Sequence, residues 1–173
     1  MIKIFVALII FFSYSNALKA TNIRVVDLKN IIDNHPILFD FLQLIKIDQD
    51  KHRKNFSIQE KELEAEFEKI QQLKLILDKD ELDREINNYN EKLNNFNLNI
   101  ENFNFHYEKQ ISNLKNEILS EIIELLKKYS INNQIDLILD SNNYILSTNA
   151  INISDIILEK SNKIKIETNF EKF

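Results

Sequence analysis

Residues 82–107 read LDREINNYNEKLNNFNLNIENFNFHY, and apolar side chains recur along this stretch at alternating steps of four and three residues. The recurring residues are Leu82, Ile86, Tyr89, Leu93, Phe96, Ile100, Phe103 and Tyr107. This spacing keeps one narrow apolar stripe on one side of a helix, which is typical of a coiled-coil seam. A seam needs a second helix to cover it, so the stretch predicts one half of a long helical arm.

The second helix is predicted directly upstream, from about Pro36 to Leu77, where apolar residues recur every seven positions. The residues at these positions are Phe56, Leu63, Ile70 and Leu77. Asp78, followed three residues later by Glu81, has the spacing of a capping box, which marks a new helix start. We expect the return helix to run to about Tyr129. Two helices of about 40 and 48 residues would give an arm roughly 60–70 Å long.

Short β-branched runs flank the predicted arm. Residues 23–28 (IRVVDL) and residues 135–140 (IDLILD) are each predicted to form a strand. Residues 141–143 (SNN) have the composition of a turn, so residues 144–147 are predicted to return as the other strand of a hairpin. The fold class is therefore α+β, mainly α, with a helical hairpin inserted into a small β-sheet body. The residues expected in the body core are Ile23, Val25, Leu137 and Leu139.

Polar residues mark the predicted ends of the helices. Pro36 suits a first helical turn, and a preceding Asp or Asn side chain can accept hydrogen bonds from the free N–H groups there. An Asn can also take the left-handed conformation that ends a helix. The residues expected in these roles are Asp33 or Asn34 before the first arm helix, Asn132 or Asn133 after the second, and Asn152 or Ser154 before a short helix that reaches Leu158.

The N-terminus has the layout of a secretory signal peptide. Lys3 supplies a positive charge, residues 4–12 form an apolar run, and Ala17 ends a small-x-Ala cleavage site, with Ala20 as a second cleavage point. The apolar run is too short to span a bilayer comfortably. We therefore predict that residues 1–17 are removed on export, which leaves the mature chain more acidic. The alternative is a retained N-terminal anchor.

The composition excludes several classes of protein. With Gly 0, the chain cannot contain a Walker loop, a dinucleotide-binding fingerprint or a nucleophile elbow, because each needs glycine for its backbone conformation. With Cys 0, it has no disulfide, thiolate nucleophile or Cys-ligated zinc. The net charge of −5 argues against nucleic-acid binding, which needs a basic stripe. We expect no cofactor and no enzymatic activity.

Two groups of titratable residues could be mistaken for metal sites. His52 and His106 would lie at about the same level of the arm, but no third and fourth ligands accompany them, so we expect two solvated histidines. The acidic residues between 78 and 85 lack the spacing and the glycine of an EF-hand. We interpret them as the capped, solvated tip of the arm.

Some apolar residues of the predicted arm fall outside the seam. Leu98 and Phe105 are seven residues apart, so they share one line of the helix away from the seam. Such residues either pack where helices splay or a second subunit approaches, or they stay open to hold another chain. The residues we select as facing another chain are Ile58, Leu75, Leu98 and Phe105.

Three segments carry a resemblance to a known family. Residues 23–27 (IRVVD) with the following Pro36 look like an opening strand and its turn into an arm helix. Residues 135–140 with residues 143–146 (NYIL) look like a closing strand hairpin. Residues 151–157 (INISDII) are similar to a helix start of the form D-I-T-[DE]. In this order and spacing, the segments resemble the Skp/OmpH family of periplasmic chaperones.

The resemblance implies a jellyfish-like homotrimer that acts in the periplasm of a Gram-negative bacterium. Such a protein would be an ATP-independent holdase that binds unfolded outer-membrane β-barrel proteins in a cavity between its helical arms. The implied division of the chain is a signal peptide at 1–17, a trimerisation body at 21–35 and 130–162, an arm at 36–129 with its tip near 78–81, and a tail at 163–173.

One property departs from the family. The best-known members are basic with positively charged arms, whereas this chain has a sequence pI of about 5.3. An acidic surface argues against contact with lipopolysaccharide or membrane, and against capture of clients by charge. The alternative function is a coiled-coil structural or tethering protein of the cell envelope without a client. Residues 163–173 alternate weakly and predict a frayed end or a late strand.

Overall fold

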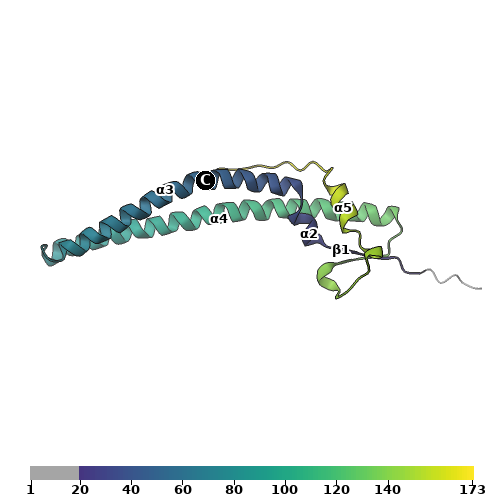
Figure 1. Cartoon of the computed structure of the whole chain (residues 1–173), viewed down its shortest axis with the longest axis horizontal. Coiled ribbons are helices and arrows are strands. Elements are labelled where there is room, and N and C mark those ends of the chain that lie inside the picture. Colours follow the sequence, from purple (N-terminus) through teal and green to yellow (C-terminus); the bar gives the residue numbers. More distant parts are fainter. Residues whose placement is uncertain (1–19) are drawn as a thin grey trace, which may run out of the picture.

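The structure is a computed structural model that describes residues 20–173. The predicted signal peptide, residues 1–17, lies outside the described residues. Within residues 20–173, every helix falls short of the combination of length and apolarity that a bilayer crossing requires. Figure 1 shows a long, gently curved two-helix arm joined at one end to a small body.

The arm consists of α3 (Pro36–Leu73) and α4 (Lys79–Asn132), which run antiparallel and side by side. With 38 and 54 residues, they are about 57 and 81 Å long. The predicted helical hairpin is confirmed, although α3 ends at Leu73 instead of Leu77 and α4 continues to Asn132. A turn over residues 74–78 joins the two helices at the tip.

The apolar ladder of α4 lies against α3. All eight of its members are half-buried or buried. Phe56 of α3 meets Phe96 and Phe103 of α4 edge to face, at ring-centroid distances of 6.2 and 5.1 Å. Nearer the tip, Phe67 contacts Tyr89 at 5.7 Å. Aromatic pairs of this kind contribute about 0.5–1.5 kcal/mol each beyond their buried area, so they hold the two helices together along the arm.

The body contains a parallel two-stranded sheet of β1 (Ile23–Val26) and β2 (Leu137–Asp140). In its register, Ile23 pairs with Leu137 and Val26 pairs with Asp140. Parallel strands cannot be joined by a tight turn and need a long crossover connection. Here the whole arm is the crossover, which explains why the two strands lie so far apart in the sequence.

The predicted strand hairpin after β2 is wrong. Residues 141–143 form a short 3₁₀ turn (η1), and residues 144–147 belong to no strand. The hairpin would need residues 144–147 to pair with the outer edge of β2. Instead, Asp140 at the end of β2 accepts a hydrogen bond from the N–H of Asn142 at 3.4 Å, so the chain turns out of the strand there. It returns to the sheet at Asn152, just after the 3₁₀ turn η2 (Asn149–Ile151), where it forms a parallel bridge with Val25 of β1. Ile145 and Leu146 lie in this loop and extend into solvent, with exposures of 105% and 88%, because no other part of residues 20–173 covers them.

The core lies where the body meets the base of the arm. There α2 (Leu28–Asp33) and α5 (Ser154–Ser161) pack against α4. The most deeply buried aliphatic residues are Val26, Ile31, Leu38, Ile118, Ile122 and Ile157. Burial of each aliphatic side chain stabilises the fold by about 1.5–3 kcal/mol. This cluster, more than the short sheet, fixes the body to the arm.

The cap at the start of α3 differs from the prediction. The side chain of His35, instead of Asp33 or Asn34, accepts a hydrogen bond from a free N–H group of the first turn at 3.3 Å. Asp33 forms ion pairs with Lys29 and Lys115 at 2.6 and 2.7 Å. His35 is 1% exposed, and this burial lowers its pKa, which keeps the ring in the neutral form that can accept a hydrogen bond.

Among the other helix ends, the start of α4 matches the prediction. Asp78 caps α4, because its carboxylate accepts a hydrogen bond from the N–H of Glu81 at 2.9 Å. At α5 the predicted caps Asn152 and Ser154 are wrong, because the N-cap position is Ile153, which makes no side-chain hydrogen bond. Asn152, one residue earlier, accepts a hydrogen bond from the N–H of Ser154 at 2.9 Å. After α4, Gln134 takes the left-handed conformation (φ 50°) in place of the two asparagines before it.

The C-terminal residues 162–173 run back along the arm. In Figure 1 this yellow segment passes from the end of α5 along α3, and the C-terminus lies beside the arm. Residues 165–173 have no regular secondary structure, yet Ile166 and Phe170 pack against the core cluster. The expectations of a frayed end and of a late strand are therefore both wrong.

Candidate functional site

Exposed apolar side chains on the arm form the first candidate surface. The four predicted positions, Ile58, Leu75, Leu98 and Phe105, are between 55% and 90% exposed. Ile58, Leu98 and Phe105 each lie two residues after one of the phenylalanines that meet edge to face between the helices. Because two residues turn a helix by about 200°, these three side chains point away from the partner helix.

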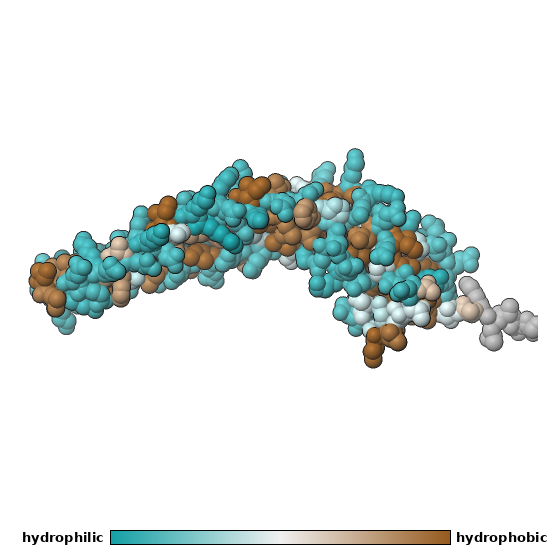
Figure 2. Space-filling view, in the orientation of Figure 1, coloured by the Kyte–Doolittle hydropathy of each residue, from teal (hydrophilic) through white to brown (hydrophobic). Residues whose placement is uncertain are grey.

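Ile58, Leu98 and Phe105 lie at about the same distance along the arm. The phenylalanines that precede them contact one another inside the hairpin, so Ile58 lies on the outer side of α3 while Leu98 and Phe105 lie on the outer side of α4. Figure 2 shows apolar patches along the arm, separated by hydrophilic side chains. Leu75 is separate, in the turn at the tip beside the exposed Ile76. The apolar surface therefore occurs on opposite sides of the hairpin and at its tip.

A further exposed set at the base of α3 was missed from the sequence. Residues 37–47 (ILFDFLQLIKI) are apolar almost all round the helix. Leu38, Phe41 and Ile45 are buried, whereas Phe39, Leu44 and Ile47 are exposed. The buried residues recur at steps of three and four, as in the seam, and this period is the signal that could have separated the two sets.

The body carries the second candidate surface. Val25 is buried, and Ile23 and Leu139 are half-buried. Leu137, predicted for the core, is 44% exposed and does not belong to the core cluster of residues 20–173. Among these residues, β1 is the strand that pairs with β2, and the other edge of β2 carries no strand. A groove of about 430 Å³ lies next to Leu137, between the sheet and the end of α4. Figure 2 shows an apolar protrusion at the edge of the body, where the loop after β2 lies in Figure 1.

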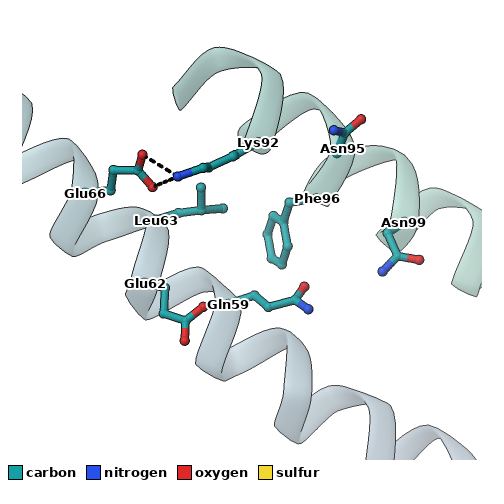
Figure 3. A pocket seen from close by; sticks show the side chains of 8 residues that line it. All are labelled: Gln59, Glu62, Leu63, Glu66, Lys92, Asn95, Phe96 and Asn99. Carbon is teal, nitrogen blue, oxygen red and sulfur yellow. Dashed lines mark hydrogen bonds and ion pairs between the residues drawn. The ribbon is translucent and has the colours of Figure 1, made fainter. Parts of the chain in front are cut away.

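An open pocket lies between the two arm helices (Figure 3). Leu63 and Phe96 supply its apolar part, and Lys92 reaches across to Glu66 with two hydrogen bonds of 2.7 and 2.9 Å. The remaining lining includes the amide side chains of Gln59, Asn95 and Asn99. Amides both donate and accept hydrogen bonds, so this pocket can contact the main chain of another polypeptide.

A buried polar pair crosses the arm near its base. The hydroxyl of Tyr107 donates a hydrogen bond to Oδ2 of Asp48 at 2.7 Å. Burial, and then the hydrogen bond to Asp48, raises the pKa of Tyr107. Burial alone would raise the pKa of Asp48, but the hydrogen bonds from Tyr107 and from the N–H of Phe173 hold it below its ordinary value. The pair stabilises the fold. The sequence signal for it was the position of Tyr107 in the seam, because a buried tyrosine hydroxyl needs a hydrogen-bond partner.

The two arm histidines lie close to the end of the chain. Their rings are 5.4 Å (His52) and 5.7 Å (His106) from the ring of Phe173, and both are half-buried. The expectation of two solvated histidines is wrong, because the C-terminal phenylalanine packs against them. Within residues 20–173, no three His, Cys, Asp or Glu side chains gather closely enough to hold a metal ion.

The comparisons with known proteins agree with this architecture. The family described as "Outer membrane protein (OmpH-like)" matches residues 22–160. The chain belongs to the OmpH-like family. The match spans β1, the whole arm, β2 and nearly all of α5, and it stops before the segment that runs back along the arm. No curated protein matches the OmpH-like chain.

A solved structure shares the fold of the present chain. It is the crystal structure of a protein described as an OmpH-like outer membrane chaperone from Caulobacter crescentus CB15. The two chains superpose with a TM-score of 0.67 at 12% sequence identity, over 88% of this chain and 89% of the other. At this identity the likeness establishes the fold, and the resemblance seen in the sequence is confirmed at the level of the family.

Proposed function

We propose that this OmpH-like protein is an ATP-independent holdase that binds unfolded outer-membrane β-barrel proteins and prevents their aggregation. The observation that carries the proposal is the division of apolar residues on the arm. One set closes the seam within the hairpin, and a second set, which includes Ile58, Leu98 and Phe105, remains exposed on its outer sides. Surface of this kind is suited to holding another chain.

The mechanism depends on several weak contacts. Each exposed apolar residue would bind a client segment weakly, and several contacts on one client would act together through their high effective concentration. A held client could not pair its free strand edges with those of another chain, which is the route to aggregation. With a net charge of −5, burial of apolar client segments would contribute more than charge attraction.

The assembly that we propose is a homotrimer joined through the body. Ile145 and Leu146 are almost fully exposed, Leu137 is partly exposed, and the outer edge of β2 pairs with no strand among residues 20–173. A small body buries too little apolar surface alone, so three bodies packed together would cover these residues. The three arms would then enclose a cavity, which only one outer side of each hairpin could face.

We place the protein in the periplasm. The N-terminal sequence up to Ala17 has the layout of a cleaved export signal. This location brings the protein into contact with outer-membrane proteins before they fold. It also provides no ATP, which agrees with the sequence, since the chain contains no glycine for a phosphate-binding loop.

The proposal is tested by light scattering. A urea-unfolded β-barrel protein is diluted into buffer with purified mature chain at three chains per client, and suppression of scattering is expected. The variant Leu98→Ser/Phe105→Ser should raise the half-suppressing concentration about tenfold, which corresponds to about 1.4 kcal/mol of lost affinity. Ile131→Ser is the matched control, because Ile131 is an exposed apolar residue at the body end of the same helix.

Two results would contradict the holdase. Absence of suppression by the wild-type chain would favour the alternative, a structural or tethering protein without a client. Equal loss in Leu98→Ser/Phe105→Ser and in Ile131→Ser would show that the outer side of the arm has no special role.

A further inference from the structure

The C-terminal segment occupies a defined aromatic site on the arm. Phe170 contacts Phe41 edge to face at 5.9 Å. The ring of Phe173 lies 5.3 Å from Phe103 and also contacts the two histidines of the arm. Phe41 and Phe103 are each only 3% exposed with the segment in place. The segment therefore covers apolar surface of both arm helices with two aromatic anchors three residues apart.

The polar contacts of this site go to the main chain of the segment. The side-chain amide of Gln110 donates to the carbonyl oxygen of Glu171 and accepts from its N–H, both at 2.9 Å. Nε2 of His106 lies 2.8 Å from the same carbonyl oxygen. The N–H of Phe173 donates to Oδ2 of Asp48 at 3.3 Å. An amide that bonds to both main-chain groups of one residue recognises an extended peptide without regard to its side chain.

This combination defines the chemistry of a ligand. It is an extended polypeptide segment with two aromatic side chains three residues apart, recognised through the main chain between them. Extended segments of an unfolded polypeptide present the same groups. Main-chain hydrogen bonds with pockets for particular side chains are a general mode of peptide recognition.

We propose that residues 162–173 act as a built-in competitor that occupies a binding site for aromatic-bearing client segments near the base of the arm. This inference rests on the proposed holdase function. Because the segment is tethered to α5, its effective concentration at the site is on the order of millimolar. A single weak client segment would not displace it, whereas a client already held by other contacts on the arm would. The site would therefore open as a client becomes engaged.

The first test is a peptide titration. The variant Phe170→Ser/Phe173→Ser of the full chain removes both anchors, and a fluorescein-labelled peptide with the sequence of residues 162–173 is added to it and to the wild-type chain. Fluorescence anisotropy should show at least tenfold tighter binding to the variant, because its site is vacated. The tail variant Lys172→Ala, which keeps both anchors, should behave like wild type.

Two controls report on the chemistry of the site. A peptide with both phenylalanines replaced by serine should not bind. Adding Gln110→Ala to the double variant should weaken peptide binding several-fold, while the neighbouring Lys109→Ala should not. Equal binding of the peptide to wild type and double variant, or no binding to a double variant with wild-type helix content, would overturn the proposal.

A second measurement needs no variant. Hydrogen exchange of the Glu171 and Phe173 amides in the wild-type chain should accelerate when an unfolded β-barrel protein is added in excess, because the segment is displaced. Unchanged exchange rates, with client binding shown by light scattering, would overturn the competitor role. The peptide titration needs no barrel protein, so failure of the holdase assay would contradict the proposed function and leave the site intact.

Discussion

Tyr107 of α4 and Asp48 of α3 form a hydrogen bond of 2.7 Å across the arm, and both side chains are buried. The exposed fractions are 1% for Tyr107 and 4% for Asp48. A buried carboxylate is costly unless it is hydrogen-bonded. The pair therefore ties the two helices together at the level where the C-terminal phenylalanine also contacts the arm.

The substitution Tyr107→Phe should lower the free energy of unfolding by about 1–3 kcal/mol, because it leaves the buried Asp48 carboxylate without its hydroxyl donor. Urea unfolding at pH 7, followed by circular dichroism, measures the change. Tyr89→Phe is the control, since Tyr89 is a half-buried tyrosine of the same seam. An equal effect of the two substitutions would contradict a specific role of the Tyr107–Asp48 bond.

The same pair predicts a dependence of stability on pH. The pKa of Asp48 in the folded chain is below its ordinary value, so its ionised form stabilises the fold above the unfolded pKa of about 3.9. That contribution disappears as the pH falls through the folded pKa. We expect the free energy of unfolding to decline below about pH 4, and to decline less steeply in Asp48→Asn. Asp33, whose pKa is lowered by Lys115 and Lys29, acts in the same direction in both proteins. Parallel pH profiles of wild type and variant would contradict the assignment.

Phe103 and Phe105 provide a matched pair on one helix. Phe103 is 3% exposed within the seam, whereas Phe105 is 62% exposed on the outer side. Phe103→Ala should therefore lower the free energy of unfolding by about 3–5 kcal/mol. Phe105→Ala should change it by no more than about 0.5 kcal/mol. Thermal unfolding followed by circular dichroism separates the two, and a large loss in Phe105→Ala would show that its side chain is covered in the assembly.

The exposed loop after β2 predicts the oligomeric state. If Ile145 and Leu146 are covered in a homotrimer, the variant Ile145→Asp/Leu146→Asp should be monomeric, because burying two carboxylates at an apolar interface is costly. Size-exclusion chromatography with light scattering should give three times the chain mass for the wild type. Ile76→Asp, at the distant tip of the arm, should leave the trimer unchanged. A wild-type monomer would contradict the proposed assembly.

The arm was predictable because its determinants are local. The period from Leu82 to Tyr107 follows from helix geometry alone, and the cap at Asp78 depends on a residue only three positions away. The body was harder to predict, because residues 144–147 have the composition of a strand but pair with no strand in the described part of the chain, residues 20–173. Strand pairing depends on contacts across the body, such as the parallel pairing of β1 with β2, which the composition of a single run does not specify.

The sequence by itself determined a long helical hairpin, the strands on either side of it and the absence of the glycine-dependent and cysteine-dependent sites. Periodicity and composition are properties of neighbouring residues and can be read without the fold. Only the tertiary structure decided that β1 and β2 pair in parallel, that His35 caps α3, and that Phe173 contacts Phe103 and the two arm histidines. The strand pairing and the Phe173 contacts join residues that are far apart in the chain, so no local pattern specifies them. The His35 cap is a local hydrogen bond, but the neutral ring that accepts it depends on burial by the rest of the fold.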